Sequence, residues 1–185
     1  EPKKIAESVS KTGFEASVRS VARILSEREL RGSAVIARGD ARNTDLFPSD
    51  RFDLVVTSPP YLNAIDYLRG HRMALIWLGH ALSELRAVRA ISIGSEATRP
   101  GSPTESNEAL VQHVFGQSVP FEPRIQRIID RYAHDMLELA SNVQRTLVAN
   151  GRVVVVVADS VLKGRRVPTG KIVEEALSRK GLNVV

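Results

Sequence analysis

The chain has 185 residues, 43% of them hydrophobic, which is enough for one ordinary domain with a buried core. It contains no cysteine, which excludes disulfides and thiolate metal sites and fits a reducing, cytoplasmic location. The chain has 26 Lys and Arg against 21 Asp and Glu. The resulting net charge of +5 is modest, so it suits a polyanionic partner without requiring one. No apolar run approaches the length of a membrane span, and the histidines lack ligand spacing, so neither a membrane segment nor a metal site is predicted.

The first part of the chain is predicted to hold a helix, two strands and a longer helical stretch. Apolar residues at helical spacing predict the first helix: Phe14, Val18, Val21, Ala22 and Leu25. Residues 33–37, SAVIA, predict a short strand, and residues 53–57 predict a second one because valine is β-branched. Residues 64–85 are compatible with helix, with Gly70 as the weak point and Trp77 placed in the core.

The second part is predicted to contain two helices and two strands. Residues 92–121 hold much of the Ser, Gly and Pro, which predicts an insertion or mobile loop rather than a core element. The clearest helix starts at Pro123 and is closed by Asn-Gly at 150–151. Its apolar stripe comprises Ile125, Ile128, Ile129, Tyr132, Met136, Leu139, Ala140, Val143 and Leu147. Residues 152–158, with five valines, predict a strand buried on both faces, 170–181 a short helix and 182–185 a further strand.

This alternation of apolar strands and amphipathic helices predicts an α/β fold with an open, mostly parallel sheet. In such sheets, ligands bind beyond the carboxyl ends of the strands. Two unusual loops, GDAR at 39–42 and TSPPY at 57–61, follow predicted strands at this end. We therefore expect the two loops to be neighbours in space.

The TSPPY turn is chemically specific. A residue before proline is held extended, and a proline has no N–H, so Ser58, Pro59 and Pro60 form a stiff turn that shows carbonyl oxygens and no donors. Tyr61 adds a flat aromatic ring. Such a surface suits a planar ligand with an amino group, and two acceptors out of the ring plane favour a pyramidal nitrogen that can attack a methyl electrophile. The alternative is an inert turn, because paired prolines also end strands with no further role.

Two basic features have similarly open interpretations. The segment 162–171, LKGRRVPTGK, is either a solvated loop or a contact for phosphates. Arg124, Arg127 and Arg131 share one helix face, which is either exposed to solvent or follows a phosphate backbone. Asp40 either turns the chain or contributes to a site at the strand end.

The run Asp53 to Tyr61, DLVVTSPPY, resembles motif IV of the amino-methyltransferases, which use S-adenosylmethionine to methylate exocyclic nitrogens of nucleic acids. The serine variant is most similar to the cytosine-N4 branch, and the adenine-N6 branch more often has Asp or Asn there. RGDAR at 38–42 is similar to the acidic motif of that family, and GRVVVVVADS at 151–160 is similar to the next strand, with Asp159 at its end. The resemblance covers about residues 33–67 and 150–185, and it is more specific in the first block.

This resemblance implies a Rossmann-like methyltransferase fold and assigns roles to individual residues. The Ser58 side chain and the Pro59 carbonyl would hold the target amine, Pro60 would stiffen the turn, and Tyr61 would stack on the base. The base would be flipped out of duplex DNA, since a stacked base cannot reach such a pocket. Asp40 and the backbone of Ala41 would lie by the adenine of S-adenosylmethionine. The same resemblance implies a role in DNA methylation such as that of restriction-modification systems.

One departure from the family concerns the cofactor. The Gly-rich cofactor loop of the F-x-G-x-G type is absent from residues 1–185. We therefore expect a single but partial catalytic domain over 1–185, with the loop upstream of Glu1 or downstream of Val185, upstream being favoured. These residues alone should bind the cofactor poorly. The alternatives are an RNA or protein-glutamine methyltransferase, which Ser58 disfavours, and a non-catalytic nucleic-acid-binding module.

Overall fold

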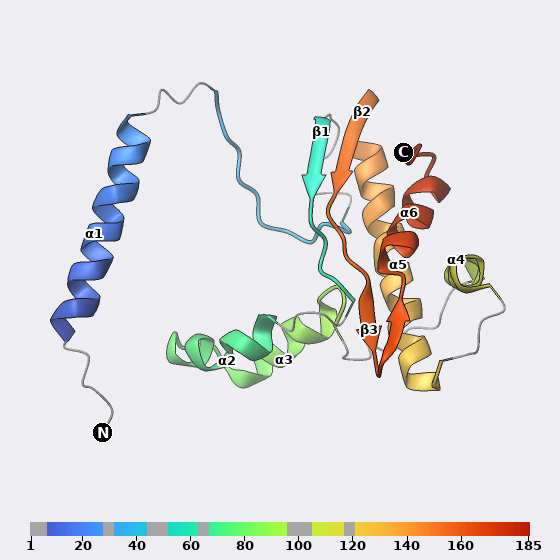
Figure 1. Ribbon diagram of the computed structural model, residues 1–185, viewed down its shortest axis with the longest axis horizontal. Helices are drawn as coiled ribbons and strands as arrows, with labels where there is room; N and C mark the ends of the chain where they lie inside the picture. Colours follow the sequence, from blue (N-terminus) through green and yellow to red (C-terminus); the bar gives the residue numbers. More distant parts are fainter. Residues whose placement is uncertain (1–6, 28–31, 44–51, 63–66, 96–104, 117–120) are drawn as a thin grey trace. The chain divides into compact units, whose positions relative to one another are not determined.

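The computed structural model describes residues 7–27, 32–43, 52–62, 67–95, 105–116 and 121–185 (Figure 1). Within these ranges the protein is a mixed α/β structure with six helices and two small two-stranded sheets. The chain divides into two compact units, Glu1–Arg38 and Gly39–Val185. The second unit holds both sheets, five of the helices and both loops singled out above.

The first unit contains helix α1, Glu7–Ser26, as the apolar spacing predicted. The strand predicted at 33–37 is wrong, because residues 32–38 adopt no regular structure. Val35 and Ile36 are both exposed. Their β-branched side chains favour extended backbone, but a strand is stable only when a neighbouring strand accepts its ladder hydrogen bonds.

The second unit is built on a parallel strand pair, which confirms the prediction of parallel pairing. Strand β1, Phe52–Thr57, pairs with β2, Leu147–Val155. The register is regular from Leu54 opposite Arg152 onward and is interrupted before it. The predicted helix end at Asn150-Gly151 is wrong, because the helix stops at Thr146 and these two residues lie in the irregular part of β2.

Asn150 and Gly151 allow this irregularity. Asn150 has φ +65°, a left-handed conformation that asparagine tolerates better than most residues. At Gly151 an added Cβ would lie 3.0 Å from the Val148 carbonyl oxygen and 3.1 Å from that of Phe52. Strand β2 can therefore approach β1 at this point only because Gly151 has no side chain.

The faces of the β1–β2 sheet differ. Val155 and Val157 pack against the helical core. The apolar side chains of the opposite face are exposed: Leu54, Val56, Val154 and Val156. The expectation that residues 152–158 are buried on both faces is therefore wrong within the second unit, whose described helices cover one face only.

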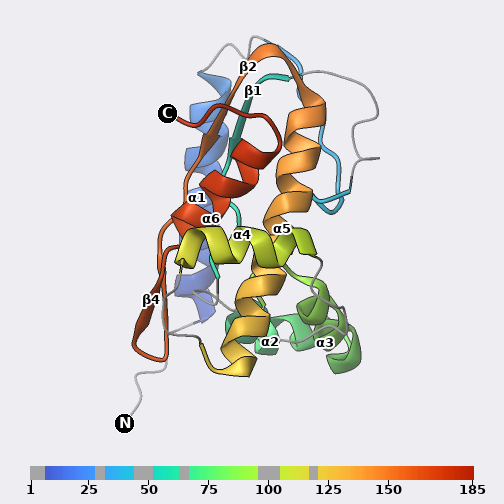
Figure 2. The same ribbon diagram turned by 90° about the vertical axis from the view of Figure 1, so that its right-hand side faces the viewer.

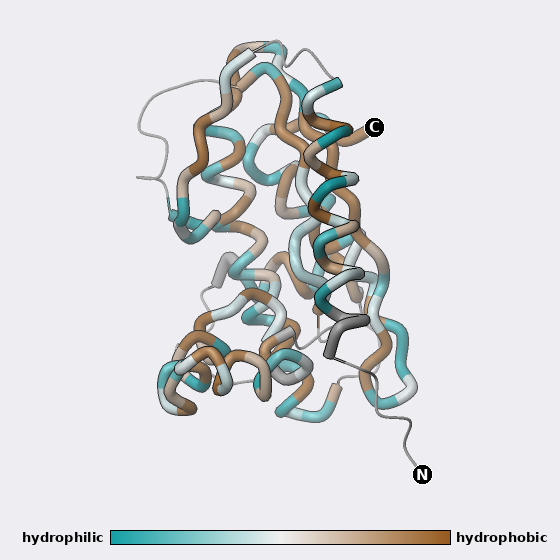
Figure 3. Tube along the Cα trace, turned by 90° about the vertical axis from the view of Figure 1, so that its left-hand side faces the viewer, coloured by the Kyte–Doolittle hydropathy of each residue, from teal (hydrophilic) through white to brown (hydrophobic). Residues whose placement is uncertain are grey.

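Three helices build the core. Helix α5, Pro123–Thr146, packs against α6, Thr169–Arg179, and α4, Glu105–Phe115, contacts both (Figure 2). The predicted stripe of α5 is confirmed from Ile125 to Val143, whose members are buried or packed against the core, whereas Leu147 begins β2. The statement that residues 92–121 contribute no core element is wrong for α4, because Leu110 is fully buried. The helical turns in Figure 3 alternate between hydrophilic and hydrophobic colours, as amphipathic helices do.

The remaining elements are a helix pair and a hairpin. The stretch predicted as one helical region forms α2, Tyr67–Trp77, and α3, Leu82–Ile91, which contact each other. The chain breaks at Gly79, with φ +93°, and not at Gly70. Trp77 is 92% exposed, so its predicted core position is wrong.

After β2, the chain forms an antiparallel hairpin of β3, Ser160–Leu162, and β4, Arg165–Val167. Its turn residues, Lys163 and Gly164, both have positive φ, as two-residue hairpin turns require. This hairpin occupies most of the segment predicted as a basic loop. The final strand predicted at 182–185 is wrong, because these residues adopt no regular structure.

Candidate functional site

The TSPPY turn directly follows β1. The Thr57 carbonyl accepts a hydrogen bond from Val156 N–H at 3.0 Å, so strand pairing continues to the edge of the turn. Beyond it the chain alternates, with Ser58 and Pro60 exposed and Pro59 buried. Tyr61 is half-buried, and the next residue, Leu62, is fully buried in the core. The turn is therefore anchored by two apolar side chains while it presents the Ser58 side chain to solvent.

Past Thr57, the polar atoms of this turn have no hydrogen-bond partner among the described residues. Among the described residues, the carbonyl oxygens of Ser58, Pro59 and Pro60 accept no hydrogen bond, and the Ser58 hydroxyl has no partner. The two prolines lack donors of their own. The exposed Ser58 hydroxyl and Pro60 carbonyl can therefore accept donors from a ligand, whereas Pro59 is buried.

A second segment packs on the turn from the side of Tyr61. Gly94 has φ +73°, and a Cβ added there would lie 2.6 Å from the Tyr61 carbonyl oxygen. Ser95 N–H donates to the Ser92 carbonyl at 3.3 Å, which closes a tight turn around Gly94. Only glycine permits this conformation and this approach together. Residues 92–95 therefore form one wall beside Tyr61, a contact that the sequence did not predict.

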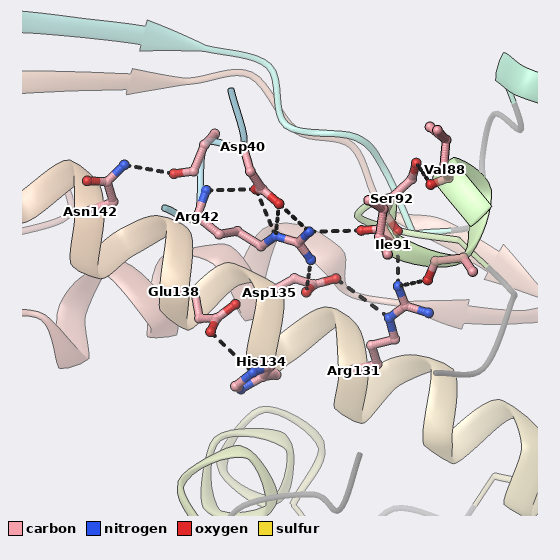
Figure 4. Close-up of polar contacts among 12 residues, drawn as sticks. Asp40, Arg42, Val88, Ile91, Ser92, Arg131, His134, Asp135, Glu138 and Asn142 are labelled. Atoms are coloured by element: carbon pink, nitrogen blue, oxygen red, sulfur yellow. Dashed lines mark hydrogen bonds and ion pairs between the residues drawn. The ribbon is translucent and has the colours of Figure 1, made fainter. Parts of the chain in front are cut away.

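The GDAR loop is held by its own arginine. Arg42 donates from Nε to Asp40 Oδ1 at 2.9 Å and from Nη2 to Asp40 Oδ2 at 2.6 Å (Figure 4). The Arg42 backbone N–H also donates to Asp40 Oδ1 at 3.0 Å, so Asp40 turns the chain as well. This paired carboxylate raises the pKa of Arg42, with Asp135 adding to the effect. Asp40 is therefore fixed in orientation, although its side chain stays 45% exposed.

Arg42 connects this loop to α5. Its Nη1 donates to Asp135 Oδ1 at 2.6 Å, and its Nη2 donates to the Ile91 carbonyl at 2.8 Å. Asp135 is 3% exposed and lies among the core-facing residues of α5. Burial raises the pKa of Asp135 above its ordinary value, and the hydrogen bond from Arg42 opposes that rise. The charged form of Asp135 therefore depends on its cation partners.

Arg131 joins the same network from one turn earlier. Its Nη2 donates to the Ala90 carbonyl at 2.7 Å and to the Ser92 carbonyl at 3.3 Å, and its Nε lies 4.0 Å from Asp135 Oδ2. This arginine was predicted to face solvent or a phosphate backbone, and it instead fixes the end of α3. Through Arg42 and Arg131, α5 holds both the GDAR loop and the segment that packs on Tyr61 (Figure 4). The two loops are thus linked indirectly, through α5 and the segment after α3. The strand-end argument does not apply to GDAR, because residues 33–37 form no strand.

Two further α5 residues complete the arrangement. Asn142 donates from Nδ2 to the carbonyls of Ala41, at 2.9 Å, and Asn43, at 3.1 Å. Tyr132 is 1% exposed, and its hydroxyl has no hydrogen-bond partner among the described residues. Burial raises the pKa of Tyr132, and the negative charge of Asp135 adds to this. Tyr132 is therefore a buried residue of α5 that keeps its phenol neutral.

Sequence reasoning found the two loops and missed what holds them together. An available signal was Asp135 itself, an acidic residue inside the apolar stripe of α5, where only a paired charge is tolerated. Its partner Arg42 lies 93 residues away, and no local pattern connects them. The ion pair between Arg42 and Asp135 is therefore visible only in the structure.

Asp159, which the resemblance placed at a strand end, has a local structural role. It accepts hydrogen bonds from Arg166 Nε at 2.8 Å and from Gly170 N–H, in the first turn of α6, at 3.2 Å. The Arg166 guanidinium is the main cause that lowers the pKa of Asp159, and Gly170 N–H contributes. Asp159 therefore fastens the hairpin to α6.

No three His, Asp or Glu side chains gather into a metal-binding group within the described ranges. None of the helices in those ranges combines the length and apolarity needed to cross a bilayer. Comparisons with protein-family models, with curated protein sequences and with solved structures give no significant match to this chain.

Proposed function

We propose that this protein is a DNA amino-methyltransferase with a Rossmann-like catalytic domain. It would transfer a methyl group from S-adenosylmethionine to an exocyclic amine of a DNA base, with cytosine N4 preferred and adenine N6 as the second choice. The observation that carries the proposal is the TSPPY turn at the carboxyl end of β1, where the Ser58 hydroxyl and the carbonyls of residues 58–60 have no hydrogen-bond partner among the described residues.

In this proposal each residue of the turn has one task. The Ser58 hydroxyl and the Pro59 carbonyl accept the two N–H bonds of the target amine, and Pro60 keeps the turn rigid. The half-buried Tyr61 stacks on the base. Two acceptors out of the base plane make the nitrogen lone pair available for attack, so positioning rather than a covalent intermediate provides the rate enhancement. The absence of cysteine fits this chemistry and excludes a thiolate nucleophile.

The residues of the GDAR loop fit part of a cofactor site. S-adenosylmethionine supplies an electrophilic sulfonium methyl group when bound. Arg42 orients the Asp40 carboxylate, whose exposed side can accept a bond from the adenine amine. The Ala41 carbonyl is held by Asn142, so the contribution of Ala41 is assigned to its N–H. Asn142 and Arg42 then serve as positioning residues for this loop.

A non-catalytic binding module is the second candidate. Its support is the absence of a Gly-rich cofactor loop from residues 1–185, together with the engagement of both Asp40 carboxylate oxygens by Arg42. RNA and protein glutamine are further substrate classes for the same chemistry. Enzymes that act on them more often carry Asn or Asp at the position of Ser58.

The decisive experiment identifies the methylated product. The full-length gene product is incubated with S-adenosylmethionine and unmethylated DNA, or with RNA, and the nucleosides are separated and weighed by mass spectrometry. We expect N4-methylcytosine from DNA. Methylated RNA alone would change the substrate class, and the absence of methylation in both would support the binding module.

A further inference from the structure

We propose that the start of α5 and the β3–β4 hairpin form one basic surface that grips the phosphate backbone of the substrate. This inference rests on the proposed nucleic-acid function and extends it from the base to the backbone. The basic surface comprises Arg124, Arg127, Lys163, Arg165 and Arg166. All five side chains are exposed.

Two contacts bring these segments together. Lys163 Nζ in the hairpin turn lies 2.7 Å from Glu122 Oε2, directly before α5. The Arg165 guanidinium lies over the ring of Phe121, 3.9 Å from its centre, in a cation–π contact. The hairpin therefore lies beside the start of α5, which carries Arg124 and Arg127.

The exposed cations of this surface favour an anion. Lys163 pairs with Glu122, and Arg166 pairs with Asp159. Arg166 keeps a side chain that is 79% exposed in spite of its pair. The amino-terminal end of α5, a helix of 24 residues, adds partial positive charge beside Arg124. Exposed ion pairs contribute little stability, so a phosphate can replace either carboxylate at small cost.

The position of the surface connects it to the proposed base pocket. Strands β1 and β2 are parallel, so their carboxyl ends meet at one edge, where Val156 N–H donates to Thr57 just before the TSPPY turn. The hairpin continues from β2 beyond that same edge (Figure 1). A nucleic-acid strand that places a base at Tyr61 would carry its neighbouring phosphates within reach of the hairpin.

The test is the salt dependence of binding by the full chain. A fluorescein-labelled DNA duplex is titrated at several salt concentrations and followed by fluorescence anisotropy. The variant Lys163→Gln/Arg165→Gln/Arg166→Gln should lower the slope of log K against log salt by about 2 to 3, since each phosphate contact contributes about 0.9. Its affinity at low salt should fall at least roughly tenfold, which is the scale for the loss of several such contacts.

Two further variants separate this effect from lost charge and from misfolding. The control Lys11→Gln/Arg19→Gln/Arg23→Gln removes the same charge from exposed positions on α1 and should leave the slope close to that of the wild type. Glu122→Gln releases Lys163 from its pair and should tighten binding roughly twofold or threefold, within the range for one exposed ion pair. Far-ultraviolet circular dichroism of each variant checks that the fold is retained.

The outcomes separate this inference from the proposed function. An unchanged slope in the hairpin variant, an equal loss in the α1 control, or no binding by the wild type overturns the basic surface. Hairpin-dependent binding without methyl transfer supports the surface and overturns the enzyme. The same hairpin-dependent slope with an RNA duplex that binds more tightly than DNA supports the phosphate surface and moves the substrate to RNA.

Discussion

Arg42 and Asp135 form a short ion pair between the GDAR loop and α5, with 2.6 Å between Arg42 Nη1 and Asp135 Oδ1. Both side chains are largely withdrawn from water. Arg42 reaches in addition to Asp40 and to the Ile91 carbonyl, so one guanidinium joins three segments of the chain. The conformation of the GDAR loop therefore depends on a charge in the core.

The first prediction concerns this pair. Asp135→Ala should lower the free energy of unfolding by about 3 to 5 kcal/mol, because it leaves Arg42 charged and without its buried partner. Arg42→Met/Asp135→Leu should recover a large part of that loss, since apolar residues need no charge partner. Urea denaturation of both variants and the wild type measures this. A double variant less stable than Asp135→Ala would show that the remaining contacts of Arg42 outweigh the pair.

The second prediction concerns the wall beside Tyr61. Gly94→Ala should cost about 1 to 2 kcal/mol for its left-handed backbone and a further roughly 1 to 3 kcal/mol for the approach to the Tyr61 carbonyl. Gly79→Ala is the matched control, because Gly79 has φ +93° and no atom within 4 Å of an added Cβ. Thermal and urea unfolding give both values. Equal losses in the two variants would mean that residues 92–95 do not press on the turn.

The third prediction concerns the buried hydroxyl of Tyr132. Because this hydroxyl has no hydrogen-bond partner among the described residues, Tyr132→Phe should keep the free energy of unfolding or raise it by up to about 1 kcal/mol. Chemical denaturation measures the difference. A loss greater than about 1 kcal/mol would reveal a partner for the hydroxyl, such as a bound water.

The fourth prediction concerns acid stability. The pKa of Asp159 in the folded protein lies below its ordinary value of 3.8, chiefly because Arg166 donates to it. The charged form therefore stabilises the fold above the ordinary value, and this contribution is lost as the pH falls through the lowered pKa. Asp159→Asn should be less stable than the wild type at neutral pH, and the difference should shrink below pH 3.8. A difference that stays constant with pH would contradict this assignment.

The sequence predicted a helix with a long hydrophobic pattern and two strands that pair with each other in the fold. The apolar stripe of α5 extends along most of the helix, and the β-branched residues of β1 and β2 lie in two strands that pair in parallel. Residues 33–37 also contain β-branched residues, Val35 and Ile36, but no strand lies beside them among the described residues, so propensity alone did not form a strand. Helix α4 was hidden by the Ser, Gly and Pro of the segment around it.

In the candidate site, too, the sequence predicted the local feature and not the long-range contacts. The TSPPY turn was predictable because the effect of proline on backbone geometry is local. Its support was not predictable, because Asp135 and Gly94 act on residues that lie far from them in the sequence. The hairpin turn was not predicted, because Lys163 is not a residue type that usually adopts the positive φ that it has beside Gly164.

The most direct test of the central claim is the rate of methyl transfer to DNA by the full-length gene product with Tyr61 replaced. If Tyr61 stacks on the target base, Tyr61→Phe should keep most of the rate, and Tyr61→Ala should lose roughly tenfold to hundredfold, since one stacked base is worth about 1 to 3 kcal/mol. Far-ultraviolet circular dichroism of both variants checks that the fold is retained. A Tyr61→Ala variant that methylates DNA at the wild-type rate would contradict the assignment of the TSPPY turn as the base pocket.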